Sequence, residues 1–127
     1  MSRDIASHSS VDFHGRRILL AAEGGPMLVS ETDALDLISE ALGAGASLIA
    51  IPALRLAPAF FSLKTGLAGG MLQKITNYRL GLAVVGEVPA DALKSQALRD
   101  FIAESYRRGQ VLFVADMAEL EARLAPR

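Results

Sequence analysis

Apolar residues along this chain follow two alternating patterns, one typical of strands and the other of helices. Short, nearly continuous apolar runs have the length of β-strands and end near glycine or proline. These runs cover residues 16–23, 47–51, 80–86 and 111–115. The segment 11–14 precedes Gly15 and is a candidate hairpin partner for the first run. The pattern therefore predicts four strands, or five if the hairpin forms.

Between these runs, apolar residues recur every three or four positions, as on the buried face of an amphipathic helix. Helices are expected to begin at Ser30, after Thr65, at Ser95 and at Asp116. They are expected to end at Gly43 and Gly45, at Asn77 and at Gly109. The pairs Ser30 with Asp33 and Asp116 with Glu119 have the spacing of capping boxes, which supports two of these starts.

This alternation of strands and helices predicts an α/β fold. Connections of this kind are right-handed, and the strands that they join run parallel. We therefore expect a mainly parallel sheet of four or five strands built from successive βα units. The length of 127 residues suits a single α/β domain over residues 1–127, in which residues 1–10 form a frayed N-terminal segment.

The charge balance argues against two classes of partner. The chain has 13 Lys and Arg residues and 14 Asp and Glu residues, so its net charge is −1. No excess of positive charge is available to bind a nucleic-acid backbone or an acidic membrane surface. The apolar runs are also far shorter than the ~20 residues that a membrane span needs. Because the N-terminus lacks the apolar stretch of a signal peptide, we expect a cytoplasmic protein.

The residue types present also limit the chemistry. The chain has no cysteine, which removes thiolate nucleophiles, disulfides and cysteine-based metal sites. The histidines His8 and His14 both lie near the N-terminus, without acidic residues at metal-ligand spacing. We therefore expect no catalytic residue, no metal and no cofactor, and the interpretation leans away from an enzyme. The mean hydropathy of +0.33 is high for a small monomer and favours an oligomer interface.

Three segments carry a family resemblance. They read FFSLKTGLAGGMLQKITNY over 60–78, then LAVVGEV over 82–88 and LRDFIAESYRRGQVLFV over 98–114. Together they resemble the bacterial domain of unknown function 4180 family, and the resemblance covers about residues 18–124. Its most specific parts are the KTGLAG run with Gln73, Lys74, Asn77 and Tyr78, and the block 99–102 with Glu104. One departure is Gly70, which stands where the family tends to have an acidic residue.

The resemblance implies a fold but no known activity. The family's order of elements looks like the STAS-like fold of anti-sigma-factor antagonists and sulfate-transporter tails. Switch proteins with that fold carry a phosphorylated serine at the start of the helix after the middle strand. The matching place in this chain is 62–66, so the resemblance makes Ser62 and Thr65 candidate phosphosites. The Asp-Ser-x-Gly type of motif is missing there, so the match is one of position only.

Small and polar residues gather on one face of the predicted second helix. Each glycine inside a helix costs up to ~1 kcal/mol relative to alanine, so three of them at or near the start of one helix need a reason. This candidate ligand or partner surface comprises Lys64, Thr65, Gly66, Gly69, Gly70, Gln73 and Asn77. Close packing on a neighbouring helix or subunit, an anion at the helix start, and phosphorylation are its alternative explanations.

The favoured hypothesis follows from this surface. We expect a non-enzymatic interaction or regulatory module of STAS-like type that self-associates, with a dimer as the favoured homo-oligomer and a further protein partner as a candidate. A bulky side chain at Gly70 is then expected to abolish association and to leave the fold intact.

Acidic residues follow three of the predicted strands, namely Glu23, Glu87 and Asp116. The carboxyl ends of parallel strands share one edge of a sheet, where ligands of open α/β folds bind. Lys64 is expected at the same edge. The alternative hypothesis is therefore a small-molecule or nucleotide/anion-binding protein that uses this edge and the glycine-rich helix start, and this alternative includes an enzyme. The plainer explanation is that Asp116 caps a helix and the two glutamates are loop residues.

Overall fold

One mixed sheet organises the structure, a computed structural model that describes residues 9–108 and 111–126. Its five strands lie in chain order, with β1 antiparallel to β2 and all other neighbours parallel. They are β1 (Ser9–Phe13), β2 (Arg16–Leu20), β3 (Leu48–Pro52), β4 (Gly81–Val85) and β5 (Val111–Val114). The predicted α/β fold, the mainly parallel sheet and the N-terminal hairpin are confirmed.

Four α-helices connect and follow these strands. They are α1 (Glu31–Ala44), α2 (Leu67–Asn77), α3 (Gln96–Arg108) and α4 (Met117–Leu124). Short 3₁₀ helices fill the connections, namely η1 (Ala53–Arg55), η2 (Pro58–Phe61), η3 (Leu63–Thr65) and η4 (Ala92–Lys94). None of the helices described is long and apolar enough to cross a membrane.

The predicted caps form at three helix starts. Asp33 accepts hydrogen bonds from the backbone N–H groups of Val29 at 2.8 Å and Ser30 at 3.1 Å. These bonds favour the charged carboxylate and lower the pKa of Asp33. Ser95 accepts from the N–H of Leu98 at 3.2 Å and Asp116 from that of Glu119 at 2.8 Å. Three of the four predicted helix starts therefore rest on the hydrogen bonds that their sequence patterns indicate.

Two boundary predictions need correction. Gly43 lies inside α1, and the helix ends at Gly45, whose φ of 73° places it in the left-handed region that glycine adopts without strain. Ser9 and Ser10 are not frayed, because they pair with Leu20 and Leu19 in the β1–β2 hairpin. The rest of the predicted frayed segment, with His8, and the predicted helix end at Gly109 lie outside the described residues.

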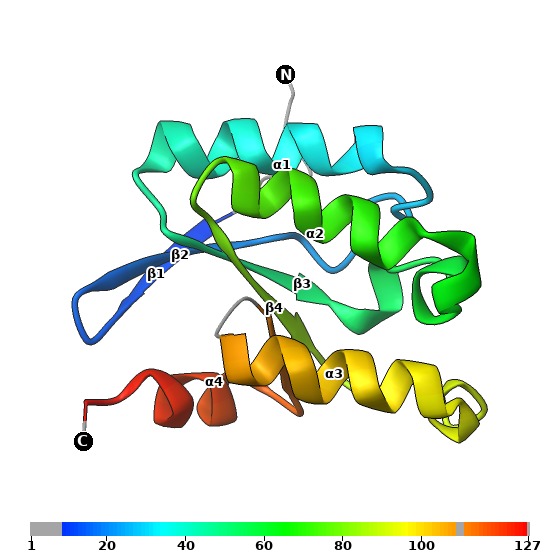
Figure 1. The fold of residues 1–127 in the computed structure, drawn as a ribbon. Coiled ribbons are helices and arrows are strands. Elements are labelled where there is room, and N and C mark those ends of the chain that lie inside the picture. The colour runs from blue at the N-terminus through cyan, green and yellow to red at the C-terminus, as the bar shows by residue number, and fades with distance from the viewer. Residues whose placement is uncertain (1–8, 109–110, 127) are drawn as a thin grey trace.

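The two faces of the sheet pack against different helices. Leu19, Ile49, Leu82 and Val111 belong to a large core cluster with residues of α1, α2 and α3. The alternate strand positions, among them Ile18, Leu48, Ala50, Ala83 and Val114, pack with Leu120 of α4. Figure 1 shows α1 and α2 side by side above the sheet, while the twist of the sheet carries β5 and α3 below them.

A buried arginine holds the loop that leaves β2. The Arg55 residue is 5 % exposed, and its burial lowers the pKa of the guanidinium. Its Nε donates to the carbonyl of Pro26 at 3.0 Å and its Nη1 to that of Ala22 at 2.9 Å. The backbone of Leu28 forms a parallel bridge with Leu56 beside it. The side-chain hydrogen bonds of Arg55 and the backbone bridge at Leu56 therefore both hold the loop after β2 against the η1 segment.

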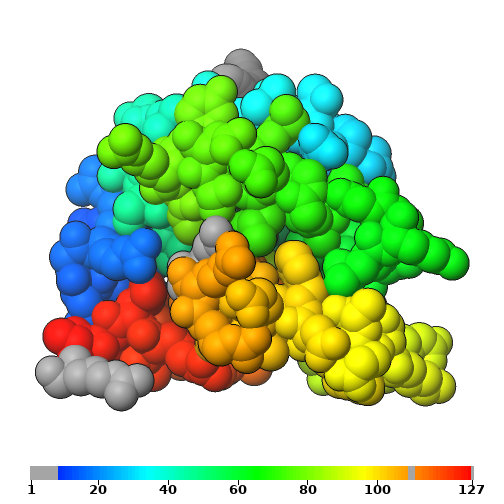
Figure 2. All heavy atoms as spheres, viewed as in Figure 1, coloured from blue at the N-terminus to red at the C-terminus, as the bar shows by residue number. Residues whose placement is uncertain are grey.

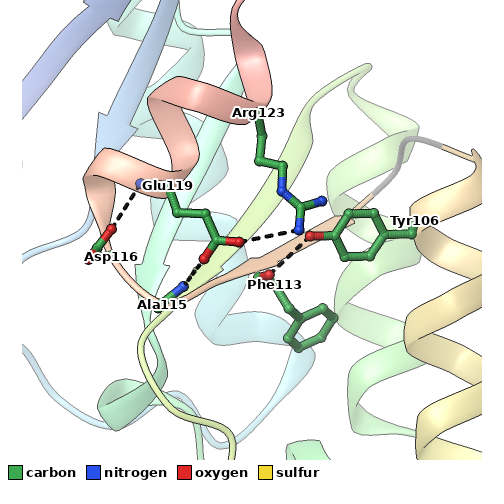
Figure 3. Close-up of polar contacts among 6 residues, drawn as sticks. All are labelled: Tyr106, Phe113, Ala115, Asp116, Glu119 and Arg123. Atoms are coloured by element: carbon green, nitrogen blue, oxygen red, sulfur yellow. Dashed lines mark hydrogen bonds and ion pairs between the residues drawn. The ribbon is translucent and has the colours of Figure 1, made fainter.

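A second polar cluster joins α3 to α4 around the edge strand β5 (Figure 3). The Tyr106 hydroxyl donates to the carbonyl of Phe113 at 3.1 Å, and the guanidinium carbon of Arg123 lies 4.7 Å from the Tyr106 ring centre. Arg123 donates to Glu119 at 3.2 Å, and Glu119 accepts from the N–H of Ala115 at 2.7 Å. The cluster thus links helices that pack on opposite faces of the sheet.

Candidate functional site

The carboxyl ends of the parallel strands border one open groove of about 940 Å³. Its walls come from the residues that follow β2, β3, β4 and β5, because parallel strands with right-handed connections all end at the same edge. Glu23, Glu87 and Asp116 all line it. The structure therefore brings together the three acidic residues that the strand ends suggested.

The three carboxylates differ in what they do within the chain. Asp116 caps α4, as the plainer explanation holds. Glu23 and Glu87 are exposed, and within the described part of the chain neither makes a hydrogen bond or an ion pair. The residues that line the groove include no Lys, Arg or His. Over the described ranges, no three His, Asp or Glu side chains are grouped closely enough to hold a metal ion.

Apolar side chains form the rest of the groove. Leu54 is 88 % exposed and Leu93 is 40 % exposed, and both border it. Pro52, Val88 and Met117 add further apolar surface to its lining. The sequence analysis missed Leu54 and Leu93. The available signal was an apolar residue inside a connection that carries no helical or strand pattern.

Lys64 does not join the acidic residues in this groove. It lines a neighbouring hollow of about 560 Å³ together with Ser62, Phe61 and Asp91, and Pro89 borders both hollows. Figure 2 shows this second hollow as a recess between the green segment near residues 58–65 and the yellow segment near residues 89–97. Successive 3₁₀ turns after β3 carry the chain away from the strand ends before Lys64 is reached.

The glycines of the predicted surface have three different environments. Gly66 has a φ of 77°, so its left-handed backbone needs glycine whatever lies outside. Gly70 is half-buried, and the carboxyl end of Glu31 from α1 occupies the space that a Cβ of residue 70 would fill. A side chain at residue 70 would therefore require the exposed Glu31 side chain to move aside. Gly69 is exposed with nothing within 4 Å of a Cβ position, so neither reason applies to it.

The polar residues of this surface bond mainly to one another or to nearby backbone. Gln73 donates to Asn77 at 2.9 Å along α2. The Thr65 hydroxyl lies 2.6 Å from the carbonyl of Ala59 and accepts from the N–H of Leu67 at 3.2 Å, so it stabilises the start of α2. Thr65 is exposed and Ser62 half-buried, and their phosphorylation stays a prediction.

Exposed apolar side chains border the same surface. At about 100° per residue, Leu35 and Leu42 fall on the side of α1 that carries Glu31, next to α2. Leu35 is 38 % and Leu42 50 % exposed, and Tyr78 at the end of α2 is 49 % exposed. The outer surface of α1 and α2, hereafter the α1–α2 surface, therefore combines these three apolar residues with the exposed residues of the predicted set.

Comparison with known proteins assigns the family. Residues 13–124 match the family model described as Domain of unknown function (DUF4180), and the chain belongs to this family. The search of curated proteins and the search of solved structures gave no match. The family resemblance drawn from the KTGLAG run and its neighbours is confirmed, whereas the STAS-like relationship stays a prediction.

Proposed function

We propose that this DUF4180 domain is a non-enzymatic interaction module that forms a dimer through its α1–α2 surface. The observation that carries the proposal is the exposure of Leu35, Leu42 and Tyr78 on the surface that also carries Gly69. Exposed apolar side chains that cluster on one surface mark interaction sites more often than scattered ones do. An exposed glycine on such a surface lets the backbone of a partner helix approach closely.

Gly69 offers a cleaner test than Gly70. A side chain at position 70 meets Glu31 within the same chain, so a variant there mixes an internal effect with an effect on association. A side chain at position 69 meets nothing within 4 Å and improves the helix propensity of α2. Gly69→Arg should therefore keep the fold and place a long charged side chain in the dimer interface.

The experiment compares molar masses by size-exclusion chromatography with light scattering. We expect a dimer for the wild type, a monomer for Gly69→Arg, and a dimer for the control Ala103→Arg, which adds the same side chain at an exposed position of α3. Equal melting temperatures would show that the fold is intact. A monomeric wild type, or a Gly69→Arg variant that stays dimeric, would contradict the proposal.

A regulatory role of the same surface would act through Ser62 or Thr65. A phosphate on Thr65 would displace the hydrogen bonds that its hydroxyl makes beside α2, and would place negative charge at the dimer surface. Intact-mass and peptide-mapping measurements on protein from its native cells test this role. Absence of phosphate under growth and stress conditions would argue against it.

The nucleotide or anion-binding alternative finds less support. Three carboxylates and no cationic side chain line the groove at the strand ends, and like charges repel an anionic ligand there. The glycine-rich helix start lies beside the separate hollow that Lys64 borders. The groove therefore favours a positively charged ligand over an anion.

A further inference from the structure

We infer that the groove at the strand ends docks a partner protein segment that presents an apolar side chain next to lysine or arginine. This inference uses a different part of the molecule from the proposed dimer surface and does not depend on it. It rests on the charge of the groove, on its apolar lining and on the way its rims are held.

The charge of the groove has one sign. Glu23 follows β2, Glu87 follows β4 and Asp116 follows β5, so the carboxylates are spread across the groove. The nearby Lys94 is paired with Asp91 at 3.4 Å and does not line the groove. Glu23 and Glu87 have no partner within the described ranges, so both are available to cations on a docked chain. Complementary charge of this kind steers a basic partner and disfavours an acidic one.

The apolar lining requires more than a simple cation. Leu54 and Leu93 are exposed where they border the groove, and Val88, Met117 and Pro52 also line it. Exposed apolar surface is removed from water only when an apolar group covers it. A lysine or arginine next to an apolar residue can pair with the carboxylates and also cover the exposed leucines. A small hydrophilic cation can pair with the carboxylates but leaves the leucines in water.

Arginines hold the backbone segments that carry both exposed leucines. Leu54 lies in η1 next to Arg55, whose guanidinium bonds the carbonyls of Pro26 and Ala22. The Leu93 carbonyl accepts a hydrogen bond from Arg99 of α3 at 2.6 Å. Backbone segments positioned in this way before binding lose less entropy when a partner docks on them.

The openness of the groove favours a protein segment over a small molecule. Ligand pockets usually bury most of the ligand surface within an enclosed space. Here Leu54 is 88 % exposed, so a small ligand on the floor of the groove would leave this rim in water. A peptide chain laid across the groove would cover both rims and still reach the carboxylates.

Fluorescence anisotropy with three short labelled peptides tests the inference. One peptide alternates leucine and lysine, one alternates leucine and glutamate, and one alternates serine and lysine. We expect measurable binding for the leucine–lysine peptide alone, with affinity that falls as salt is added. Glu87→Lys and Leu54→Ser should each weaken that binding by about tenfold. The control Asp100→Lys makes the same charge change on the exposed surface of α3, and it should change the affinity by less than about twofold.

Several outcomes would overturn the inference. They are absence of binding by the leucine–lysine peptide, equal binding by the leucine–glutamate or serine–lysine peptide, and equal weakening by Asp100→Lys, which would indicate general charge attraction. Competition by a simple alkylamine at the same concentration as the peptide would assign the groove to small amines instead. The Gly69→Arg variant should bind the peptide as the wild type does, so failure of the dimer proposal and failure of this one give different results.

Discussion

The two faces of the sheet are covered in very different ways. On one face, α1, α2 and α3 bury a continuous core that includes Ile49, Met71 and Phe60. On the other face, α4 is the one helix of the described chain whose residues join the smaller cluster, and it spans eight residues. Ala50 and Ala83 at the centre of this second face are small, which leaves room for Leu120 to pack fully buried.

The second face is not completely covered. A recess of about 270 Å³ remains between the strand ends and the start of α4, and Leu20, Ala50 and Met117 line it. Met117 and Asp116 also form part of the groove at the strand ends. Other residues of that groove, among them Ala53 and Val88, pack with the core of the first face. The groove has a wall on the less deeply packed helix.

Removal of a large side chain from the first face should have the largest effect. Phe60 is 2 % exposed, and its ring lies 5.2 Å from that of Phe61 in an edge-on arrangement. Phe60→Ala should lower the free energy of unfolding by about 3–5 kcal/mol, because it deletes buried surface and leaves a cavity. Urea unfolding followed by circular dichroism measures this change. Leu54→Ala, at an 88 % exposed site, is the control and should change it by less than about 0.5 kcal/mol.

The corresponding change on the second face should be smaller and more local. Leu120→Ala removes the one fully buried side chain of α4, and we expect a loss of about 2–3 kcal/mol. Hydrogen exchange should increase in α4 and β5 before it increases in α1. Equal increases in α1 and α4 would show that the two faces unfold as one unit, and would contradict the expectation that the α4 face is less stable.

Tyr106 tests the connection between the two layers. Tyr106→Phe keeps the ring beneath Arg123 and removes only the hydroxyl that donates to the carbonyl of Phe113. We expect a loss of about 1 kcal/mol in the free energy of unfolding. Arg123→Ala should also weaken the contact between α3 and α4, because it removes the guanidinium that lies over the Tyr106 ring as well as the bond to Glu119. If Tyr106→Phe changes nothing, the hydroxyl bond does not couple the layers.

The smallest expected effect depends on pH and belongs to the first face. Hydrogen bonds from Val29 and Ser30 lower the pKa of Asp33 in the folded state. Its contribution is therefore present above the unfolded pKa and is lost as the pH falls through the folded pKa. Asp33→Asn should remove this part of the acid dependence, which amounts to less than about 1 kcal/mol because the site is open to solvent. Urea unfolding at a series of acidic pH values measures the difference between the two proteins.

Much of the fold follows from local patterns in the sequence. The apolar runs near Ile18, Ile49 and Val84 locate strands, and Ser95 and Asp116 locate helix starts. Each of these signals involves residues only a few positions apart in the sequence. The cap hydrogen bonds and the hydrophobic periodicity that produce them also join residues at that short separation. The grouping of the three carboxylates in one groove was also predictable, because parallel strands must end together.

Other features depend on contacts between distant residues. Gly70 looks like part of an open helix face until Glu31 of α1 is seen against it. Arg55 lies in an apolar connection, and its burial follows from carbonyl groups about 30 residues earlier that accept its hydrogen bonds. The 3₁₀ turns that move Lys64 out of the groove carry no hydrophobic period of useful length. No window of a few residues contains this information.

The order of the strands has a consequence for how the chain assembles during synthesis. Because spatial order equals chain order, each new strand finds its neighbour already made, and no strand has to insert between two earlier ones. Such nearest-neighbour growth favours rapid folding from the N-terminal end as the chain leaves the ribosome. The exception is α4, which is made after all five strands yet packs against apolar residues on strands as early as β2. A nascent chain stalled before Met117 would therefore expose that face, and would be the form most in need of a chaperone.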